Sequence, residues 1–187
     1  AISGSITIPS TLGEYPVTSI GNYAFYGQTK LKKVILPDNV TTVGMFAFTY
    51  CESLEEVVLP AALKNLERGV FTNTPNLKTF IMQEGLETIG MNALAGATNT
   101  PNNALTQLDI PATVTSIGNY AFSGLAALKS VSFAESSLLD AIYSYAFAGC
   151  VKLREITLPA GLKTMGTGQA TYNTGNGQET FMVSAVF

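Results

Sequence analysis

Apolar and polar residues alternate along this chain in a pattern that returns every 23 residues. Each copy follows the scheme Leu-x-x-Val-x-Leu-Pro-x-x-Val-x-x-Ile-Gly-x-x-Ala-Phe-x-x-Cys, and residues 31–53 and 105–127 are the cleanest copies. The copies begin near Ser3 and at Leu31, Leu54, Leu77, Leu105, Leu128 and Leu153. A leucine-rich period of about 20–29 residues is typical of a solenoid, in which each turn packs on its neighbours.

Each copy predicts a short strand with one buried side, because apolar positions recur two residues apart. The two inward columns are Val34, Val57, Phe80, Leu108, Val131 and Ile156, and Leu36, Leu59, Met82, Ile110, Phe133 and Leu158. Stacked turns would place these strands about 4.8 Å apart in a parallel sheet. Proline follows the strand in most copies and ends the pairing, since it has no N–H to donate.

The second half of each copy predicts the opposite side of the solenoid. A further apolar pair is followed by a glycine and by an Ala-Phe pair, as in residues 40–48. We expect short strands and a helical turn there, with stacked phenylalanines forming a continuous spine. The glycine permits either a positive φ or close packing at a corner. The predicted fold class is therefore a leucine-rich repeat solenoid, α/β or mainly β, of about seven turns.

The predicted organisation is one solenoid over residues 1–166 and a C-terminal cap or tail over residues 167–187. The tail combines a Gly-rich loop with a segment of strand character, and we expect it to cover the last turn. Insertions of about five residues enter the first copy before Val17 and the fourth copy after Ala97. The first copy, with its insertion of residues 10–16, is expected to cover the other end, because open turns expose apolar surface.

Composition narrows the classes of function. Net charge is −3 and only 12% of residues are charged, so the basic surface of a nucleic-acid-binding protein is not expected. No apolar run is long enough to span a bilayer, so membrane insertion of this segment is not expected. A surface of Ser, Thr, Asn and Gly favours an extracellular protein.

No catalytic constellation emerges from the residues. The chain contains no histidine, which removes Ser-His and Cys-His pairs and histidine zinc sites. No phosphate-binding glycine loop is present, and the 13 acidic residues are scattered over several columns. We therefore expect no enzyme activity, no metal site and no cofactor.

The two cysteines are predicted to be free thiols. Cys51 and Cys150 occupy one repeat column four turns apart, which places them roughly 19 Å from each other. A disulfide requires Cα atoms closer than about 7 Å. Buried thiols that fill the core are the expected outcome.

Three surface features are candidates for partner binding. The first is an apolar stripe on the outward side of the strands, formed by Ile35, Val58 and Ile81 and flanked by Lys33 and Glu56. β-Branched residues also suit strands in general, and opposite charges on neighbouring strands also support register, so a purely structural role stays open.

The second candidate is an aromatic row just before the Ala-Phe pair. Its members are Tyr23, Phe46, Tyr120 and Tyr145. They could bind a partner or a sugar, or could simply stack on one another. The third candidate is the polar inserted loop of residues 98–104, with Asn99 and Asn102 as possible contacts. It could equally be a tolerated insertion.

The repeat resembles the BspA-type leucine-rich repeat family of bacterial surface proteins. The resemblance covers residues 5–166 and is carried by the core Ile-Gly-x-x-Ala-Phe, as in residues 20–25 and 117–122. Gln83 and Ala134 depart from the proline column, and Leu94 departs from the phenylalanine column. The resemblance implies a secreted or cell-surface protein that binds proteins of a host or of neighbouring cells.

The sequence therefore predicts a noncatalytic extracellular module for protein binding or adhesion. Its partner would be a protein or glycoprotein, and the module itself is expected to be monomeric. A passive spacer in a larger surface protein and a carbohydrate-binding module that uses the aromatic row remain alternatives.

Overall fold

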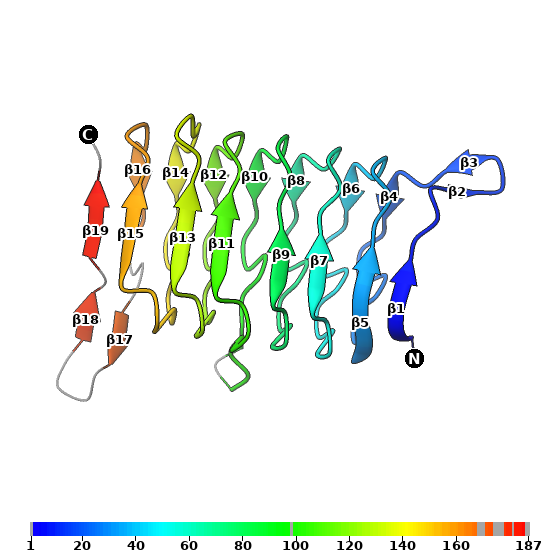
Figure 1. Ribbon diagram of the computed structural model, residues 1–187, viewed down its shortest axis with the longest axis horizontal. Coiled ribbons are helices and arrows are strands. Elements are labelled where there is room, and N and C mark those ends of the chain that lie inside the picture. The colour runs from blue at the N-terminus through cyan, green and yellow to red at the C-terminus, as the bar shows by residue number, and fades with distance from the viewer. Residues whose placement is uncertain (1, 98, 168–170, 174–177, 181, 186–187) are drawn as a thin grey trace.

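The chain folds as a right-to-left stack of similar turns in the view of Figure 1, with the N-terminus at one end and the C-terminus at the other. The computed structural model describes residues 2–97, 99–167, 171–173, 178–180 and 182–185. Every turn contributes one strand to a front face and one shorter strand to a back face. The predicted solenoid of seven turns of roughly 23 residues is confirmed.

The front face carries the strands predicted from the alternating pattern. They are β1 (Ser3–Thr7), β5 (Lys30–Ile35), β7 (Glu56–Val58), β9 (Thr79–Ile81), β11 (Gln107–Ile110), β13 (Ser130–Phe133) and β15 (Glu155–Leu158). The front pairings are parallel, and those of β5, β7 and β9 follow the 23-residue register, with Val34 beside Val57 and Val57 beside Phe80. The pairing of β11 with β13 follows it too, whereas β1 pairs with β5 at a longer offset, with Ile6 beside Val34. The first four strands form one sheet, and β11 and β13 form another.

The back face carries seven strands of two residues each. They are β4 (Ser19–Ile20), β6 (Thr42–Val43), β8 (Asn65–Leu66), β10 (Thr88–Ile89), β12 (Ser116–Ile117), β14 (Ala141–Ile142) and β16 (Thr164–Met165). This sheet continues without interruption through all seven turns. The front face is divided between β9 and β11, which the insertion after Ala97 separates in the sequence, and again between β13 and β15.

The stretch after each of the back strands β4 to β14 contains consecutive turns, and the part of the chain that the structure describes contains no helix. The expectation of helical turns is wrong for a local reason. The residue two positions before the phenylalanine has a left-handed backbone, with φ of 57° at Tyr23 and 56° at Tyr120. A left-handed residue cannot continue a right-handed helix. Its neighbours instead hydrogen-bond to the next turn, as Phe25 N does to Ala47 O at 2.8 Å.

The core lies between the two faces and consists of the predicted apolar columns. Leu31, Val57 and Leu66 have no accessible surface. The phenylalanine rings stack from turn to turn, with centroids 4.9 Å apart for Phe25 and Phe48 and 5.3 Å apart for Phe48 and Phe71. Leu94 interrupts this column, so the expected continuous spine is two separate stacks. Burial of such rings is a major source of stability.

The glycine column is explained by close packing rather than by backbone conformation. Gly90 and Gly118 are absent from the residues with positive φ. A Cβ atom at Gly118 would lie 2.7 Å from the carbonyl carbon of Gly90, and one at Gly90 would lie 2.6 Å from the carbonyl oxygen of Leu66. Both distances are shorter than van der Waals contact, so each side chain would push the adjoining turn away.

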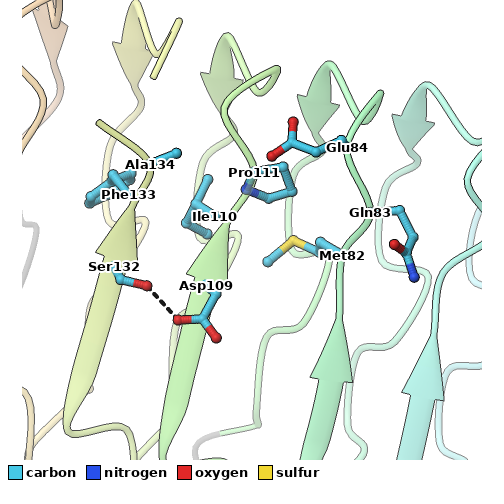
Figure 2. Close-up of a pocket in the computed structure, with 9 residues that line it drawn as sticks. All are labelled: Met82, Gln83, Glu84, Asp109, Ile110, Pro111, Ser132, Phe133 and Ala134. Carbon is cyan, nitrogen blue, oxygen red and sulfur yellow. Dashed lines mark hydrogen bonds between the residues drawn. The ribbon is translucent and has the colours of Figure 1, made fainter. Parts of the chain in front are cut away.

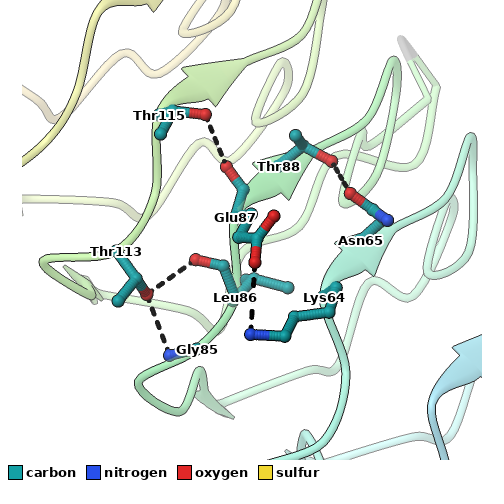
Figure 3. Close-up of polar contacts among 8 residues, drawn as sticks. All are labelled: Lys64, Asn65, Gly85, Leu86, Glu87, Thr88, Thr113 and Thr115. Carbon is teal, nitrogen blue, oxygen red and sulfur yellow. Dashed lines mark hydrogen bonds and ion pairs between the residues drawn. The ribbon is translucent and has the colours of Figure 1, made fainter.

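Polar contacts tie neighbouring turns together around the back strands (Figure 3). The Lys64 ammonium lies 3.1 Å from the Glu87 carboxylate, and the Thr88 hydroxyl lies 2.7 Å from Asn65 Oδ1. Thr113 donates its hydroxyl to Leu86 O at 2.8 Å. Each of these contacts joins one turn to the next, so they support the register that the core sets.

The two ends of the solenoid differ. The first insertion forms a hairpin of β2 (Thr11–Leu12) and β3 (Tyr15–Pro16) that projects from the N-terminal end (Figure 1). Leu12 and Tyr15 are 68% and 80% exposed, so the hairpin does not bury them against the first turn as a cap would. The inserted part of the first copy therefore does not cover the end, whereas β1 and β4 of the same copy pair with the second turn.

At the C-terminal end, β17 (Thr171–Asn173) and β18 (Gln178–Thr180) form an antiparallel pair. The final strand, β19 (Met182–Ala185), pairs in parallel with β15 and occupies the position of a further turn beside it. This backbone pairing supports the predicted cap over residues 167–187, which remains a prediction.

Candidate functional site

The apolar stripe of Ile35, Val58 and Ile81 lies on the exposed side of the front sheet. The three residues are paired in register on β5, β7 and β9. Their exposed fractions are 46%, 36% and 44%, while the residues preceding them on each strand are buried. The structure thus brings together the three residues that the sequence selected, and it leaves them accessible.

Ion pairs flank this stripe. Lys33 Nζ lies 2.8 Å from Glu56, and Lys78 Nζ lies 2.8 Å from Glu55. The pKa of the Glu55 carboxyl is lowered, first by the hydrogen bond from Lys78 and then by its charge. Such exposed pairs contribute little to stability because water screens them, so they neutralise the flanks of the stripe more than they stabilise the fold.

A row of shallow depressions follows the front face at the ends of the strands. One, of about 470 Å³, includes Ile35, Val58 and Gln83 among its lining residues. A second, of about 360 Å³, is shown in Figure 2 and lies over the ends of β11 and β13. Its lining residues are Met82, Gln83, Glu84, Asp109, Ile110, Pro111, Ser132, Phe133 and Ala134. Gln83 and Ala134, the two departures from the proline column, both line it.

Asp109 is the one charged residue in the outward column that contains the stripe. Its carboxylate accepts hydrogen bonds from the Ser132 hydroxyl (Figure 2) and from Gln107 Nε2, the latter at 3.1 Å. Asp109 also lines a depression that it shares with Ile81. The polar position and the apolar stripe share one repeat column and therefore form one continuous surface.

The aromatic row is divided into two stacked pairs. Tyr23 and Phe46 have ring centroids 5.4 Å apart at 19°, and Tyr120 and Tyr145 have centroids 4.9 Å apart at 5°. Gly69 and Asn92 separate the pairs, so the four rings do not form a single row. Stacking covers one face of each ring, which reduces the flat surface that a sugar would need.

Two further tyrosines extend the first pair. The Tyr26 ring lies 5.8 Å from Tyr23 and 5.5 Å from Tyr50, both in edge-to-face arrangements. Sequence reasoning missed them, because Tyr26 falls outside the row and Tyr50 occupies a column otherwise rich in glycine. The signal in the sequence is that Tyr50 replaces the glycine of other turns, as at Gly27. The structure explains those glycines by a left-handed backbone, with φ of 58° at Tyr50 and 67° at Gly27.

The inserted loop separates its two predicted contact residues. Asn99 is exposed in a turn. Asn102 is 2% exposed, and its amide donates to Thr74 O and Leu77 O at 3.0 and 3.2 Å. Its Oδ1 accepts from the backbone N–H groups of Ala104 and Leu105, each at 2.9 Å.

The prediction that Asn102 contacts a partner is wrong, because its side chain is buried and engaged by the backbone of two turns. Asn102 stands three residues before Leu105, as Cys51 does before Leu54, so it occupies the cysteine column. Counted forward from Leu94, as Cys51 is from Phe48, the same column would fall on Ala97, five residues earlier. The inserted residues therefore end before Asn102, and the repeat register resumes at this asparagine.

Both cysteines are buried and free, as predicted. Burial raises the pKa of the Cys51 thiol to about 11 and that of Cys150 to about 12. Each thiol lies 3.2 Å from a carbonyl oxygen of the previous turn, Phe25 O for Cys51 and Phe122 O for Cys150. The reactive thiolate is thus disfavoured at neutral pH.

The residues that the structure describes contain no group of three or more potential metal ligands from His, Cys, Asp and Glu. Among them there is also no helix long and apolar enough to cross a membrane.

The stacked turns, the parallel front sheet and the buried leucine columns define a leucine-rich repeat solenoid. Residues 3–101 and 100–181 match the BspA type Leucine rich repeat region, in six copies. The chain belongs to this family, as its resemblance indicated. No curated protein sequence matches the chain.

Solved structures of similar fold come from several bacteria. The T. pallidum Leucine Rich Repeat protein is 26% identical, with a TM-score of 0.76 over 87% of this chain and 72% of its own. A leucine-rich repeat protein from Bacteroides ovatus is 33% identical, with a TM-score of 0.75 over 86% of this chain. This chain spans only 41% of that protein.

A third structure, a leucine rich cell surface protein from Faecalibacterium prausnitzii, is 24% identical. Its TM-score is 0.52, over 88% of this chain and 65% of its own, and at this identity it supports the fold alone. Repeat proteins of this family are in general noncatalytic, and they serve as protein-interaction or structural modules.

Proposed function

We propose that this chain is a secreted or cell-surface module that binds a protein or glycoprotein through its front face. The observation that carries the proposal is the exposed stripe of Ile35, Val58 and Ile81. Folding requires the inward columns to be apolar, but it places no such demand on the outward column. An apolar patch that folding does not require is a common mark of an interaction site.

The extracellular assignment is supported by the low content of charged residues and by membership of the BspA-type repeat family, whose resemblance implies a secreted or cell-surface protein. Antibody labelling of intact source cells, with permeabilised cells as the reference, tests this part of the proposal. Labelling that requires permeabilisation would contradict it.

Binding is tested on an array of purified extracellular proteins, probed with the wild-type chain and with Val58→Asp. We expect at least one partner whose signal is lost in the variant, because a charge at the centre of the stripe must be desolvated in any apolar contact. Glu14→Gln on the projecting hairpin serves as the control variant and should bind normally. Partners that bind Val58→Asp as strongly as wild type would contradict the assignment of the front face.

The same array separates the proposal from its alternatives. A passive spacer would give no partner at all. A carbohydrate-binding module would give signals on a glycan array that disappear with Tyr120→Ala and persist with Val58→Asp. The stacked geometry of Tyr120 and Tyr145, which covers one face of each ring, makes this second result the less expected one.

A further inference from the structure

The front face divides into an apolar part and an acidic part, although both occupy the same outward column. Ile35, Val58 and Ile81 form the first part, and Asp109, Ser132 and Thr157 continue the column. In the apolar part, the neighbouring charges already neutralise one another through the pairs Lys33–Glu56 and Glu55–Lys78. Lys32, which acts on Glu55, and Asp38, which lines the depression beside the stripe, add one charge of each sign, so these six charges cancel.

The acidic part has no such neutralisation. Asp109 and Glu84 both line the depression of Figure 2, and among the described residues neither takes part in an ion pair. Glu84 Oε1 accepts a hydrogen bond from Ala112 N at 3.1 Å. Lys78 lies near Asp109 in the depression shared with Ile81, but its ammonium is held by Glu55 at 2.8 Å.

The depression is lined by apolar groups as well as by these two carboxylates. Met82, Ile110 and Pro111 line it together with Phe133. The stem of a long basic side chain can cover such apolar groups while its charged head reaches a carboxylate at the rim. Asp109 is already oriented by Ser132 and Gln107, and a carboxylate that accepts two hydrogen bonds retains the capacity to accept others.

We infer that the depression over β11 and β13 receives a basic side chain, arginine before lysine, from a protein partner whose adjoining apolar residues cover the stripe. The planar guanidinium fork matches carboxylate geometry better than an ammonium does. The inference rests on the proposed function, since it specifies the chemistry of the partner for the same face. The proposed occupant is a protein segment in which one basic residue stands next to apolar residues.

The test uses a phage-displayed library of random dodecapeptides, selected on the wild-type chain. Selected peptides are then measured by calorimetry against wild type, Asp109→Asn, Val58→Asp and Glu14→Gln. Asp109→Asn preserves the shape of the side chain and one acceptor oxygen on an exposed strand position, so it removes the charge and at most one of the two hydrogen bonds from Ser132 and Gln107. Glu14→Gln removes an equal charge away from the front face.

We expect the selected peptides to be enriched in arginine next to apolar residues. Their affinity should fall at least about tenfold with Asp109→Asn and with Val58→Asp, but should be unchanged with Glu14→Gln. Peptides that lose affinity with Val58→Asp but neither carry a basic residue nor respond to Asp109→Asn would overturn the inference and leave the proposed function intact. Equal weakening by Glu14→Gln would reveal nonspecific attraction and also overturn it. If all selected peptides bind Val58→Asp as tightly as wild type, both the proposed function and the inference are contradicted.

Discussion

Val57 and Val58 are adjacent residues on the same strand, yet their surroundings and their roles differ. Val57 points into the core and has no accessible surface, whereas Val58 is 36% exposed on the front face. The same contrast holds for Val34 with Ile35 and for Phe80 with Ile81. The inward residues are explained by the stacking of turns, and the outward residues are not.

This difference shows where a repeat protein has freedom to vary its surface. An inward position must match the column of the turns on both sides, because interiors are closely packed. An outward position meets only its two neighbours on the sheet and the solvent. The outward column can therefore change from Ile35, Val58 and Ile81 to Asp109 without disturbing the fold, and its chemistry is open to selection for binding.

The sharpest way to break the comparison is to make the same substitution at both valines. Val57→Asp buries an uncompensated charge and should cost more than about 4 kcal/mol, enough to prevent folding of a marginally stable domain. Val58→Asp should change the free energy of unfolding by less than about 1 kcal/mol. Urea denaturation followed by circular dichroism measures both, and similar losses at the two positions would contradict the account.

Removing residues 167–187 extends the comparison to the end of the stack. The deletion takes away the strand β19 that pairs with β15 and leaves the apolar side of the last turn uncovered. We expect a loss of roughly 3 kcal/mol, or about 6–12 °C in melting temperature, together with aggregation. An unchanged melting temperature and solubility would show that this segment is a tail and not a cap.

The inserted loop offers a second matched pair, of smaller effect. Asn102→Ala leaves buried backbone groups of two turns without partners and should cost about 2 kcal/mol or more. Asn99→Ala, in the same loop but exposed, should cost less than about 0.5 kcal/mol. Calorimetry measures the melting temperatures of the two variants. Equal melting temperatures would contradict the structural role assigned to Asn102.

The smallest expected effect concerns the flanking charges. Lys78 lowers the pKa of the Glu55 carboxyl in the folded protein. The ion pair therefore stabilises the fold fully above the pKa of a glutamate in the unfolded chain, about 4.3, and this stabilisation is lost as pH falls through the pKa of Glu55 in the folded protein. Glu55→Gln should therefore lose slightly less stability than wild type between about pH 6 and pH 3. Melting curves at both pH values test this, and identical pH dependence would show that the pair contributes nothing.

Much of this architecture can be predicted from the sequence, because the same pattern of buried and exposed positions recurs in every turn. The inward columns, their register, the free cysteines and the exposed stripe were all predictable from the 23-residue period. The turns were not, because aromatic residues such as Tyr23 and Tyr120 disfavour a left-handed backbone and gave no sign of it. The role of Asn102 was hidden by the inserted residues, which shifted the apparent column by five positions. The depression beside Asp109 depends on how neighbouring turns meet, which periodicity alone does not describe.

If the front stripe serves binding, its apolar side chains should not be needed for the stability of the fold. The triple variant Ile35→Thr/Val58→Thr/Ile81→Thr tests it most directly, because threonine keeps the β-branched shape that strands favour and removes only the apolar surface. We predict a free energy of unfolding within about 1 kcal/mol of wild type in urea denaturation, with an unchanged denaturant dependence. A loss of more than about 3 kcal/mol, of the size seen when core residues are truncated, would contradict the account.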